Sequence, residues 1–179
     1  MGKNSTFKLA TAIFAGLTLF GYANTGVTKT MNDSLKNTPL SLWELVDTLK
    51  NRAPYTREKI ELAINSKLTE VESSNDVFHF YRGGDLPLRE GIVISKVDLR
   101  IKRAGVHPGF LVVDLTGTCV PLESVQRHYA RLERTGVPRG RSLEEATSYS
   151  SLESWGKLSF GFREKNPGCL AFIAFDPKT

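Results

Sequence analysis

The sequence has few of the residues from which metal and redox sites are built. Its 179 residues include two cysteines and three histidines. The spacings that bring such ligands together, HxH, HExxH and CxxC, are all absent. We therefore expect no metal site and no cofactor. We expect His79, His107 and His128 to be surface residues or hydrogen-bonded structural residues.

The motifs of nucleophilic and phosphate-binding enzymes are missing as well. There is no GxSxG turn and no glycine-rich phosphate loop, since Gly83-Gly84 alone indicates a turn. Glu144 and Glu145 are adjacent carboxylates, which a helical turn would point apart. Acid–base catalysis needs only two well-placed residues from anywhere in the chain. An enzyme therefore stays open as an alternative, although the sequence favours a protein that is not an enzyme.

A large excess of one charge is also absent. The chain has 24 basic and 19 acidic residues, a formal net charge of +5. Nucleic-acid-binding domains usually carry more numerous and more clustered basic residues. We therefore expect no nucleic-acid partner.

The most apolar stretch of the chain is its N-terminus. Two lysines precede a short apolar run over residues 9–20, and the small residues Gly21 and Ala23 fit a cleavage site. The run is short for a membrane span. We predict a secretory signal peptide over residues 1–23, cleaved after Ala23, with a retained N-terminal anchor as the alternative. The mature chain would keep 156 residues and a net charge of +3, enough for one domain with a real core.

Both cysteines lie in the mature chain. An even cysteine count in an exported protein predicts a disulfide, here between Cys119 and Cys169. A bond that closes a loop of this length stabilises a fold by roughly 4 kcal/mol in the chain-entropy model. Two buried free thiols are the alternative.

Helical spacing of apolar residues comes first in the mature chain. We read residues 24–38 as a flexible tail, because they are polar and without period. A helix follows, with a capping box of Ser41 and Glu44 and an apolar face of Leu42, Leu45, Val46 and Leu49. A second helix starts at Thr56 or Arg57, with a stripe of Ile60, Ala63, Ile64, Leu68 and Val71. Together they predict a helical hairpin.

Alternating apolar residues predict the sheet that the helices cover. Strands are expected over 77–82, 91–103, 110–117, 156–163 and 169–175, with a third helix over 121–132. In the second strand Ile92 and Ile94 differ in parity from Val97, so either Val93 carries the core face there or a bulge near Ser95-Lys96 shifts the phase. Residues 134–151 have no clean period and are expected to be a long connection. The order is α-α-β-β-β-α-β-β. We predict one α+β domain over 39–179, with an antiparallel sheet of about five strands and helices on one face.

The C-terminal stretch WGKLSFGFREKNPGCLAFIAF contains two of these strands. Leu158, Phe160 and Phe162 share one face of the first strand, so its aromatic density is mainly core. In the second strand residues of both parities are apolar, which predicts a strand that is central or covered on both faces.

Two features are candidates for binding a protein partner. The first is the expected long loop and the residues around it, where arginine and aromatic side chains typical of interfaces gather: Arg134, Arg139, Arg141, Glu144, Tyr149 and Trp155. The second is the charged strand face of Lys96, Asp98, Arg100, Lys102, Lys157 and Arg163. The alternatives are a long loop whose arginines simply solvate it or pair with its own glutamates, and an ordinary solvated face.

The segments PRGRSLEEATSYSS and WGKLSFGF…NPGCLAF, in the last third of the chain, carry a resemblance to known proteins. They resemble small periplasmic immunity proteins of type VI secretion in Gram-negative bacteria. The order of a helical hairpin followed by a sheet resembles the β-lactamase-inhibitor-like architecture. The resemblance implies a periplasmic protein that blocks a delivered toxin, often a cell-wall amidase or a lipase, by plugging its active site.

Taken together, these features predict an exported, disulfide-closed binding or inhibitor module with a protein partner. Two other functions stay open. One is an envelope-modifying hydrolase that uses His79 or His128 for acid–base catalysis. The other is a non-catalytic assembly factor of the envelope.

Overall fold

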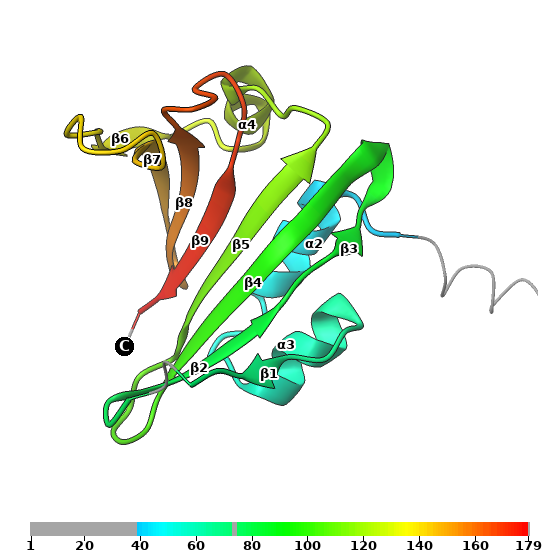
Figure 1. The fold of residues 1–179 in the computed structure, drawn as a ribbon, viewed down its shortest axis with the longest axis vertical. Helices are drawn as coiled ribbons and strands as arrows, with labels where there is room; N and C mark the ends of the chain where they lie inside the picture. The colour runs from blue at the N-terminus through cyan, green and yellow to red at the C-terminus, as the bar shows by residue number, and fades with distance from the viewer. Residues whose placement is uncertain (1–38, 73–74, 179) are drawn as a thin grey trace, which may run out of the picture. The chain divides into compact units, whose positions relative to one another are not determined.

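The computed structural model describes residues 39–72 and 75–178 (Figure 1). The predicted signal peptide over 1–23 and the predicted tail over 24–38 lie outside the described residues. From Pro39 onward the chain forms one unit by its internal contacts. No helix of the described residues is long and apolar enough to cross a membrane.

The N-terminal helical hairpin forms where the spacing predicts it. In α2 (Leu42–Lys50) the Ser41 hydroxyl accepts the Glu44 N–H at 3.3 Å, and the Glu44 carboxylate accepts the Ser41 N–H at 2.8 Å, which confirms the capping box. Thr56 caps α3 (Arg57–Ile64) through the Lys59 N–H. The prediction that Leu68 and Val71 continue this helix is wrong. Asn65 ends α3 in a left-handed conformation, and Leu68 is buried beyond it.

The sheet has nine strands, where about five were expected. Along the sheet they lie in the order β1-β2-β4-β5-β9-β8-β7-β6, with β3 on β4, and every pair is antiparallel. Their bounds are β1 (Thr69–Glu70), β2 (Phe78–Gly83), β3 (Leu86–Pro87), β4 (Ile92–Lys102), β5 (Phe110–Gly117), β6 (Glu133–Gly136), β7 (Ala146–Glu153), β8 (Gly156–Arg163) and β9 (Phe172–Pro177). A 3-10 turn, η1 (Arg89–Gly91), precedes β4.

The element order therefore differs from the predicted one. Five strands precede the third helix, α4 (Leu122–His128), and four follow it, instead of three and two. The expected long connection over 134–151 is wrong for half of its length, because β6 and β7 occupy 133–136 and 146–153. Small and hydroxyl side chains in β7 hide its strand character, while pairing with β8 along all eight of its residues stabilises it.

The predicted bulge in β4 is confirmed. The pairing of β4 with β5 shifts register between Ile94 and Lys96. The extra residue changes the phase of the strand, so that Ile94 and Val97 are both buried although their parities differ. The prediction of a central last strand is confirmed too, because β9 lies between β5 and β8 and Ile173, Ala174 and Phe175 are all buried.

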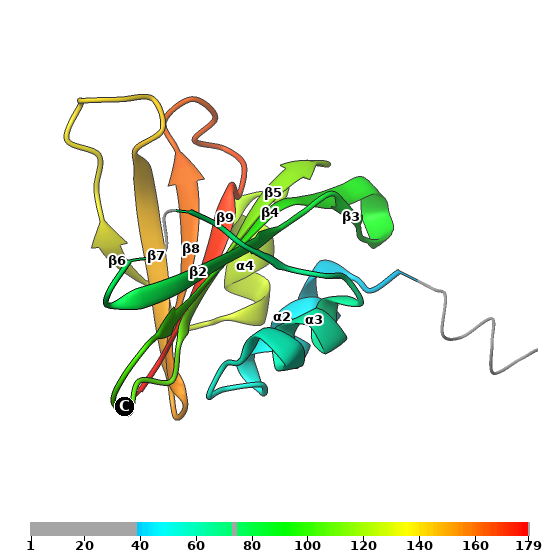
Figure 2. The ribbon, with the colours of Figure 1, turned by 60° about the horizontal axis from the view of Figure 1, so that its bottom comes forward.

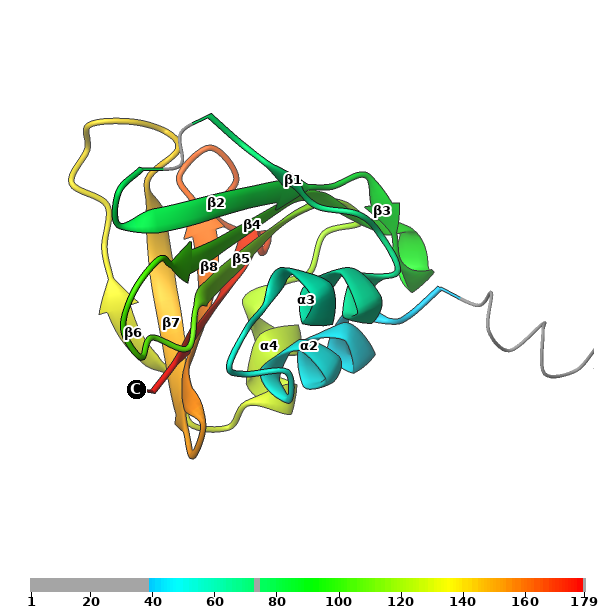
Figure 3. The ribbon, with the colours of Figure 1, turned by 90° about the horizontal axis from the view of Figure 1, so that it is seen from below.

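All three helices lie on one side of the curved sheet (Figure 3). This side, the inner face, holds the largest core side chains, including Phe160 and Phe175, which are fully buried. The Tyr129 ring, just after α4, lies 5.0 Å from the Phe160 ring and 6.3 Å from the Trp43 ring of α2. The helices therefore close the core against the inner face and leave the opposite face of the sheet uncovered by any described helix.

Candidate functional site

The opposite face of the sheet, here called the outer face, carries the residues that alternate with the core. They are the even-numbered residues of β2, β5, β9 and of β4 after the bulge, and the odd-numbered residues of β8. The six cations of these strands are Arg82, Lys96, Arg100, Lys102, Lys157 and Arg163. The three carboxylates are Asp98, Asp114 and Asp176. The predicted charged face thus exists as one surface, with a net charge of +3.

On the outer face, near the hairpin end of β4 and β5, an arginine lies between two aromatic rings. Register places Phe80, Arg100 and Phe110 side by side on three neighbouring strands. The Arg100 guanidinium lies 5.5 Å from the Phe80 ring centroid and 5.7 Å from that of Phe110. Both distances are typical of cation–π contacts. The rings are only half-buried, so this aromatic and arginine surface is open to a partner.

A carboxylate fixes the orientation of this arginine. Asp98 is 5% exposed, and Arg100 donates from Nε to Oδ1 at 3.1 Å and from a terminal nitrogen to Oδ2 at 3.4 Å. The two-point contact holds the guanidinium plane in place. Lys96 approaches the same carboxylate at 3.7 Å from the other side. The charge of Asp98 is therefore already compensated by Arg100, and Lys96 is a surplus cation.

A second arginine and aromatic pair lies towards the end of β8. The Arg163 guanidinium lies 5.5 Å from the Phe172 ring centroid and donates to Asp114 at 2.7 Å. Its Nε lies 3.4 Å from the Glu144 carboxylate. These contacts make Arg163 a positioning residue, because it connects β5, β8 and the segment before β7.

Beside this pair the sheet splits and leaves a cleft of about 530 Å³. β5 continues along β4 as far as Gly117, but its register with β9 ends at Asp114. The cleft lies in this divergence, with Lys96, Asp114 and Thr116 among its lining residues, and Arg163 and Lys165 on the side of β8 and the following turn.

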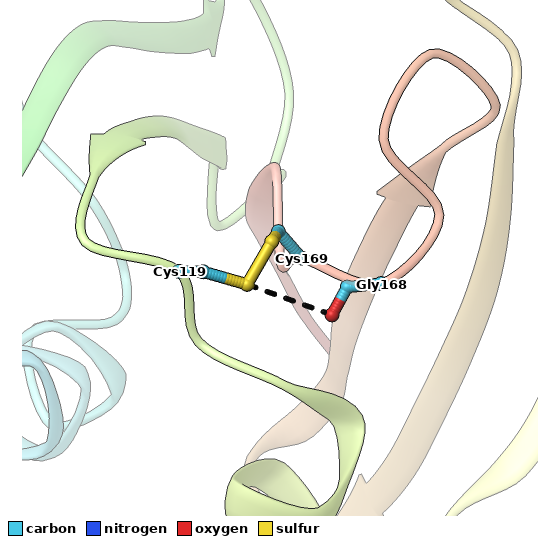
Figure 4. The surroundings of a disulfide bond; sticks show 3 residues. All are labelled: Cys119, Gly168 and Cys169. Atoms are coloured by element: carbon cyan, nitrogen blue, oxygen red, sulfur yellow. Dashed lines mark hydrogen bonds between the residues drawn. A yellow bond between two sulfur atoms is a disulfide. The ribbon is translucent and has the colours of Figure 1, made fainter.

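The predicted disulfide is present and lies at this cleft (Figure 4). Cys119, after β5, is bonded to Cys169, before β9, with 5.1 Å between the Cα atoms. The Leu170 N–H donates to the Val120 carbonyl at 2.9 Å next to it. The covalent bond and the hydrogen bond together fix the distance between the two diverging walls.

The segment 137–145, here called the arginine loop, lies beside the turn between β8 and β9 (Figures 1 and 2). Backbone hydrogen bonds join Lys165 N–H to the Leu143 carbonyl and Glu164 N–H to the Glu145 carbonyl. The Glu144 carboxylate accepts from Lys165 at 2.7 Å, and this contact lowers the pKa of Glu144 below its usual value. The arginine loop and the cleft therefore belong to one end of the sheet.

The two arginines of this loop point into solvent. Arg139 and Arg141 are exposed, and neither side chain makes an ion pair within the described part of the chain. Glu144 pairs instead with Lys165 and Arg163, and Glu145 accepts the backbone N–H of Arg139. The geometry therefore does not show the alternative in which the arginine side chains pair with the loop's own glutamates. The other alternative, arginines that simply solvate the loop, is compatible with it.

The other predicted partner-binding residues do not join this surface. Tyr149 is half-buried on the inner face, edge-to-face with Phe162 at 5.9 Å. Trp155 lies in the turn between β7 and β8 and packs against Phe175, with 6.3 Å between the ring centroids. Its indole nitrogen is buried and has no hydrogen-bond partner among the described residues. Arg134 is exposed on the edge strand β6. Since β7 runs about 23 Å between its ends, Trp155 is far from the arginine loop.

The outer-face rings are the binding candidates that sequence reasoning missed. The strand pattern predicts Phe80 and Phe110 only as strand residues, and Phe172 as core. The sequence does contain one sign of their position: Phe80, Phe110 and Phe172 alternate in step with the charged residues of their own strands, which places them on the same face. It could not identify which rings lie across from Arg100, because that depends on the register of three strands.

The three histidines lie apart, and each has local partners. His79 Nδ1 lies 2.6 Å from the Glu70 carboxylate and its Nε2 lies 3.1 Å from Arg103. The His128 ring stacks on Trp43 at 3.9 Å, and His107 accepts the Gly109 N–H. None lines the cleft. No group of three or more metal-ligating side chains that could hold an ion occurs among residues 39–72 and 75–178.

A second groove, of about 430 Å³, lies at the opposite end of β8. Its lining combines Trp155 with Pro54, Pro108 and Pro177, and with the fully exposed Val106. It is mainly apolar, and the charged residues of the outer face do not reach it.

No protein-family model matches this chain, and no curated protein or solved structure is significantly similar to it. The function is therefore argued from the geometry of the outer face and the cleft.

Proposed function

We propose that this protein is an exported binding module of the inhibitor type. In this proposal it docks on a protein partner through the outer face and occludes the partner's active site, as a periplasmic immunity protein does. The observation that carries the proposal is Arg100 held between the half-buried rings of Phe80 and Phe110. Aromatic and arginine side chains in a partly desolvated cluster are typical of the energetic centres of protein interfaces.

The mechanism follows from the rigidity of this surface. The Asp98 carboxylate fixes Arg100 before any partner arrives. Binding then loses little side-chain entropy, which favours tight association. The net charge of +3 would attract an acidic surface and raise the rate of encounter more than the affinity.

The ends of the sheet support docking by the face and not by strand addition. The terminal strand β6 has four residues, charged side chains and a register shift between Arg134 and Gly136. The other terminal strand, β1, has two residues. Short, charged and bulged edges discourage pairing with another strand.

The disulfide supports export, because such bonds persist mainly in oxidising compartments. A periplasmic location and the immunity role remain parts of the proposal that rest on the predicted signal peptide and on the resemblance.

Affinity capture from a periplasmic extract, followed by measurement with the purified partner, tests the proposal. The double variant Phe80→Ala, Phe110→Ala keeps the Arg100–Asp98 contact but removes both rings, and we expect it to weaken binding at least tenfold, roughly the cost of losing one strong interface contact. Leu62→Ala is the matched control, because Leu62 is 73% exposed on α3, away from the outer face. Equal affinities for the three proteins would reject the outer face as the interface.

The same partner tests inhibition. If it is an enzyme, one equivalent of the protein should abolish its activity, and the double variant should not. The double variant Arg139→Glu, Arg141→Glu tests separately whether the arginine loop contacts the partner. Unchanged binding would exclude the loop from the interface and leave the role of the outer face untouched.

A further inference from the structure

The cleft beside the disulfide has a surplus of positive charge. Its lining includes Lys96, Arg163 and Lys165 but only one carboxylate, Asp114. Asp114 already accepts from Arg163 at 2.7 Å. The two ammonium groups, those of Lys96 and Lys165, therefore have no carboxylate partner among the lining residues of the cleft.

The carboxylates outside the cleft do not remove this surplus. Glu144 is shared between Lys165 at 2.7 Å and Arg163 at 3.4 Å. Asp98 is bound at two points by Arg100, so its 3.7 Å approach to Lys96 is the weakest contact of the cluster. With Arg100 included, the cluster contains four cations and three carboxylates, and the excess positive charge lies at Lys96. The cations are Lys96, Arg100, Arg163 and Lys165, and the carboxylates are Asp98, Asp114 and Glu144. The neighbouring Arg139 and Arg141 add further charge that is not paired within the described residues.

The rest of the cleft suits an acidic side chain with its backbone. Thr116, Thr118 and Asn166 supply neutral hydrogen-bond donors, and Leu115 and Ala171 supply apolar surface for a methylene stem. A volume of about 530 Å³ lies within the range of sites that hold a small ligand or a few residues. The Cys119–Cys169 bond keeps the opposite walls together before a ligand enters.

We infer that this cleft receives a carboxylate side chain from an acidic segment of the protein partner. The inference rests on the proposed function, and it specifies the partner: an acidic loop at the edge of the surface that the outer face covers. The entering carboxylate would lie between Lys96 and Lys165 and complete the ion-pair cluster. A charged group at this position would add mainly to specificity and to the rate of encounter.

A capped tetraglutamate peptide is the probe, and a capped tetraglutamine peptide is its neutral counterpart. In ¹⁵N-resolved spectra of the chain from Asn24 onward, tetraglutamate should shift the amide signals of Lys96, Thr116 and Lys165 in a saturable way, and tetraglutamine should not. Each of Lys96→Gln and Lys165→Gln should weaken this binding roughly two- to fivefold, as expected for exposed ion pairs. Lys102→Gln is the matched control, because Lys102 lies on the outer face of β4 but not in the cleft.

Three results would overturn the inference. The first is that tetraglutamate leaves the amide signals of the cleft residues unchanged. The second is that Lys102→Gln weakens tetraglutamate binding as much as the two cleft variants do. The third is that free acetate, at the same carboxylate concentration, shifts the signals equally, which would indicate unspecific anion binding. If the partner still requires Phe80 and Phe110 in any of these cases, the proposed function stands and only the cleft is excluded. If tetraglutamate binding does not depend on the cleft lysines and partner binding does not depend on Phe80 and Phe110, the proposed function itself is rejected.

Discussion

The ring of Phe172 occupies the space above Gly161 on the neighbouring strand. A β-carbon built on Gly161 would lie 2.1 Å from two atoms of that ring. Arg163 lies over the same ring at 5.5 Å and pairs with Asp114. A glycine in β8 thus allows the aromatic and arginine pair beside the cleft to lie close to the sheet.

Gly161→Ala should move the Phe172 ring without unfolding the protein. The clash involves the far end of a half-buried side chain, which can rotate, so we expect a change of about 1 kcal/mol or less in the free energy of unfolding. Partner binding should weaken, because the ring and Arg163 lose their arrangement. Urea unfolding and titration with the partner measure the two effects.

Gly117→Ala is the contrasting variant. There the new β-carbon would lie 2.2 Å from the Gly91 carbonyl oxygen, and the φ of +87° disfavours any side chain. Because a backbone atom cannot rotate away, this variant should lose more stability than Gly161→Ala. If Gly161→Ala loses more stability than Gly117→Ala, the Phe172 ring cannot rotate away from the new β-carbon.

Replacing both cysteines by serine should cost much of the stability. Cys119 and Cys169 are 50 residues apart, for which the chain-entropy model gives about 4 kcal/mol. Urea unfolding of the double variant and of the oxidised wild type measures the difference. A loss below about 1 kcal/mol would mean that the Leu170–Val120 hydrogen bond and the core hold the two walls without the bond.

The stability contributed by Glu61 should disappear in acid. Its carboxylate accepts the Leu68 N–H and contacts Lys67 and Arg57, and these contacts, the first above all, lower the pKa of Glu61 from 4.5 to about 2. Because the pKa is lower in the folded state, the stabilisation is complete above about pH 4.5 and is lost as the pH falls towards 2. Glu61→Gln should therefore be less stable than wild type at pH 7, with the gap closing in that window.

Glu58→Gln, on the same helix, is the control for this series. Glu58 is exposed and makes no ion pair among the described residues, so its replacement should change little at either pH. A Glu61→Gln deficit that stays constant down to pH 2 would contradict the account of Glu61.

Two phenylalanine variants should separate the inner face from the outer face. Phe160 is fully buried beneath α4, and Phe160→Ala should cost about 3–5 kcal/mol. Phe110→Ala removes a half-buried ring and a cation–π contact, and should cost about 1 kcal/mol. The affinity for the partner should rank the two variants the other way. After correction for the unfolded fraction, Phe110→Ala should weaken partner binding more than Phe160→Ala does.

Local patterns predicted much of the fold. The apolar spacing and the capping box located α2, and the change of parity in β4 located its bulge. The short strands β1 and β3 have two residues each, too few for any alternation to appear. β7 escaped prediction because its stability comes from pairing with β8 and from contacts such as Ser150–Ser159, which depend on distant parts of the chain.

The candidate site was predictable only in part. Alternation identified six of the nine charged residues of the outer face, since parity is a local property; Arg82, Asp114 and Asp176 were not among them. The position of Arg100 between Phe80 and Phe110 depends on the register of three strands, and the cleft depends on where β5 leaves β9. Tyr149 and Trp155 have the composition of interface residues, but core packing against Phe162 and Phe175 uses them.

Site-specific photo-crosslinking in the producing cell tests the central claim most directly. A photoreactive phenylalanine at position 110 would report on the outer face, and the same residue in place of the exposed Leu62 would report on the helical side. We expect one discrete protein adduct from position 110 and none from position 62. An adduct from position 62 alone, or none from either, would contradict a partner that docks on the outer face.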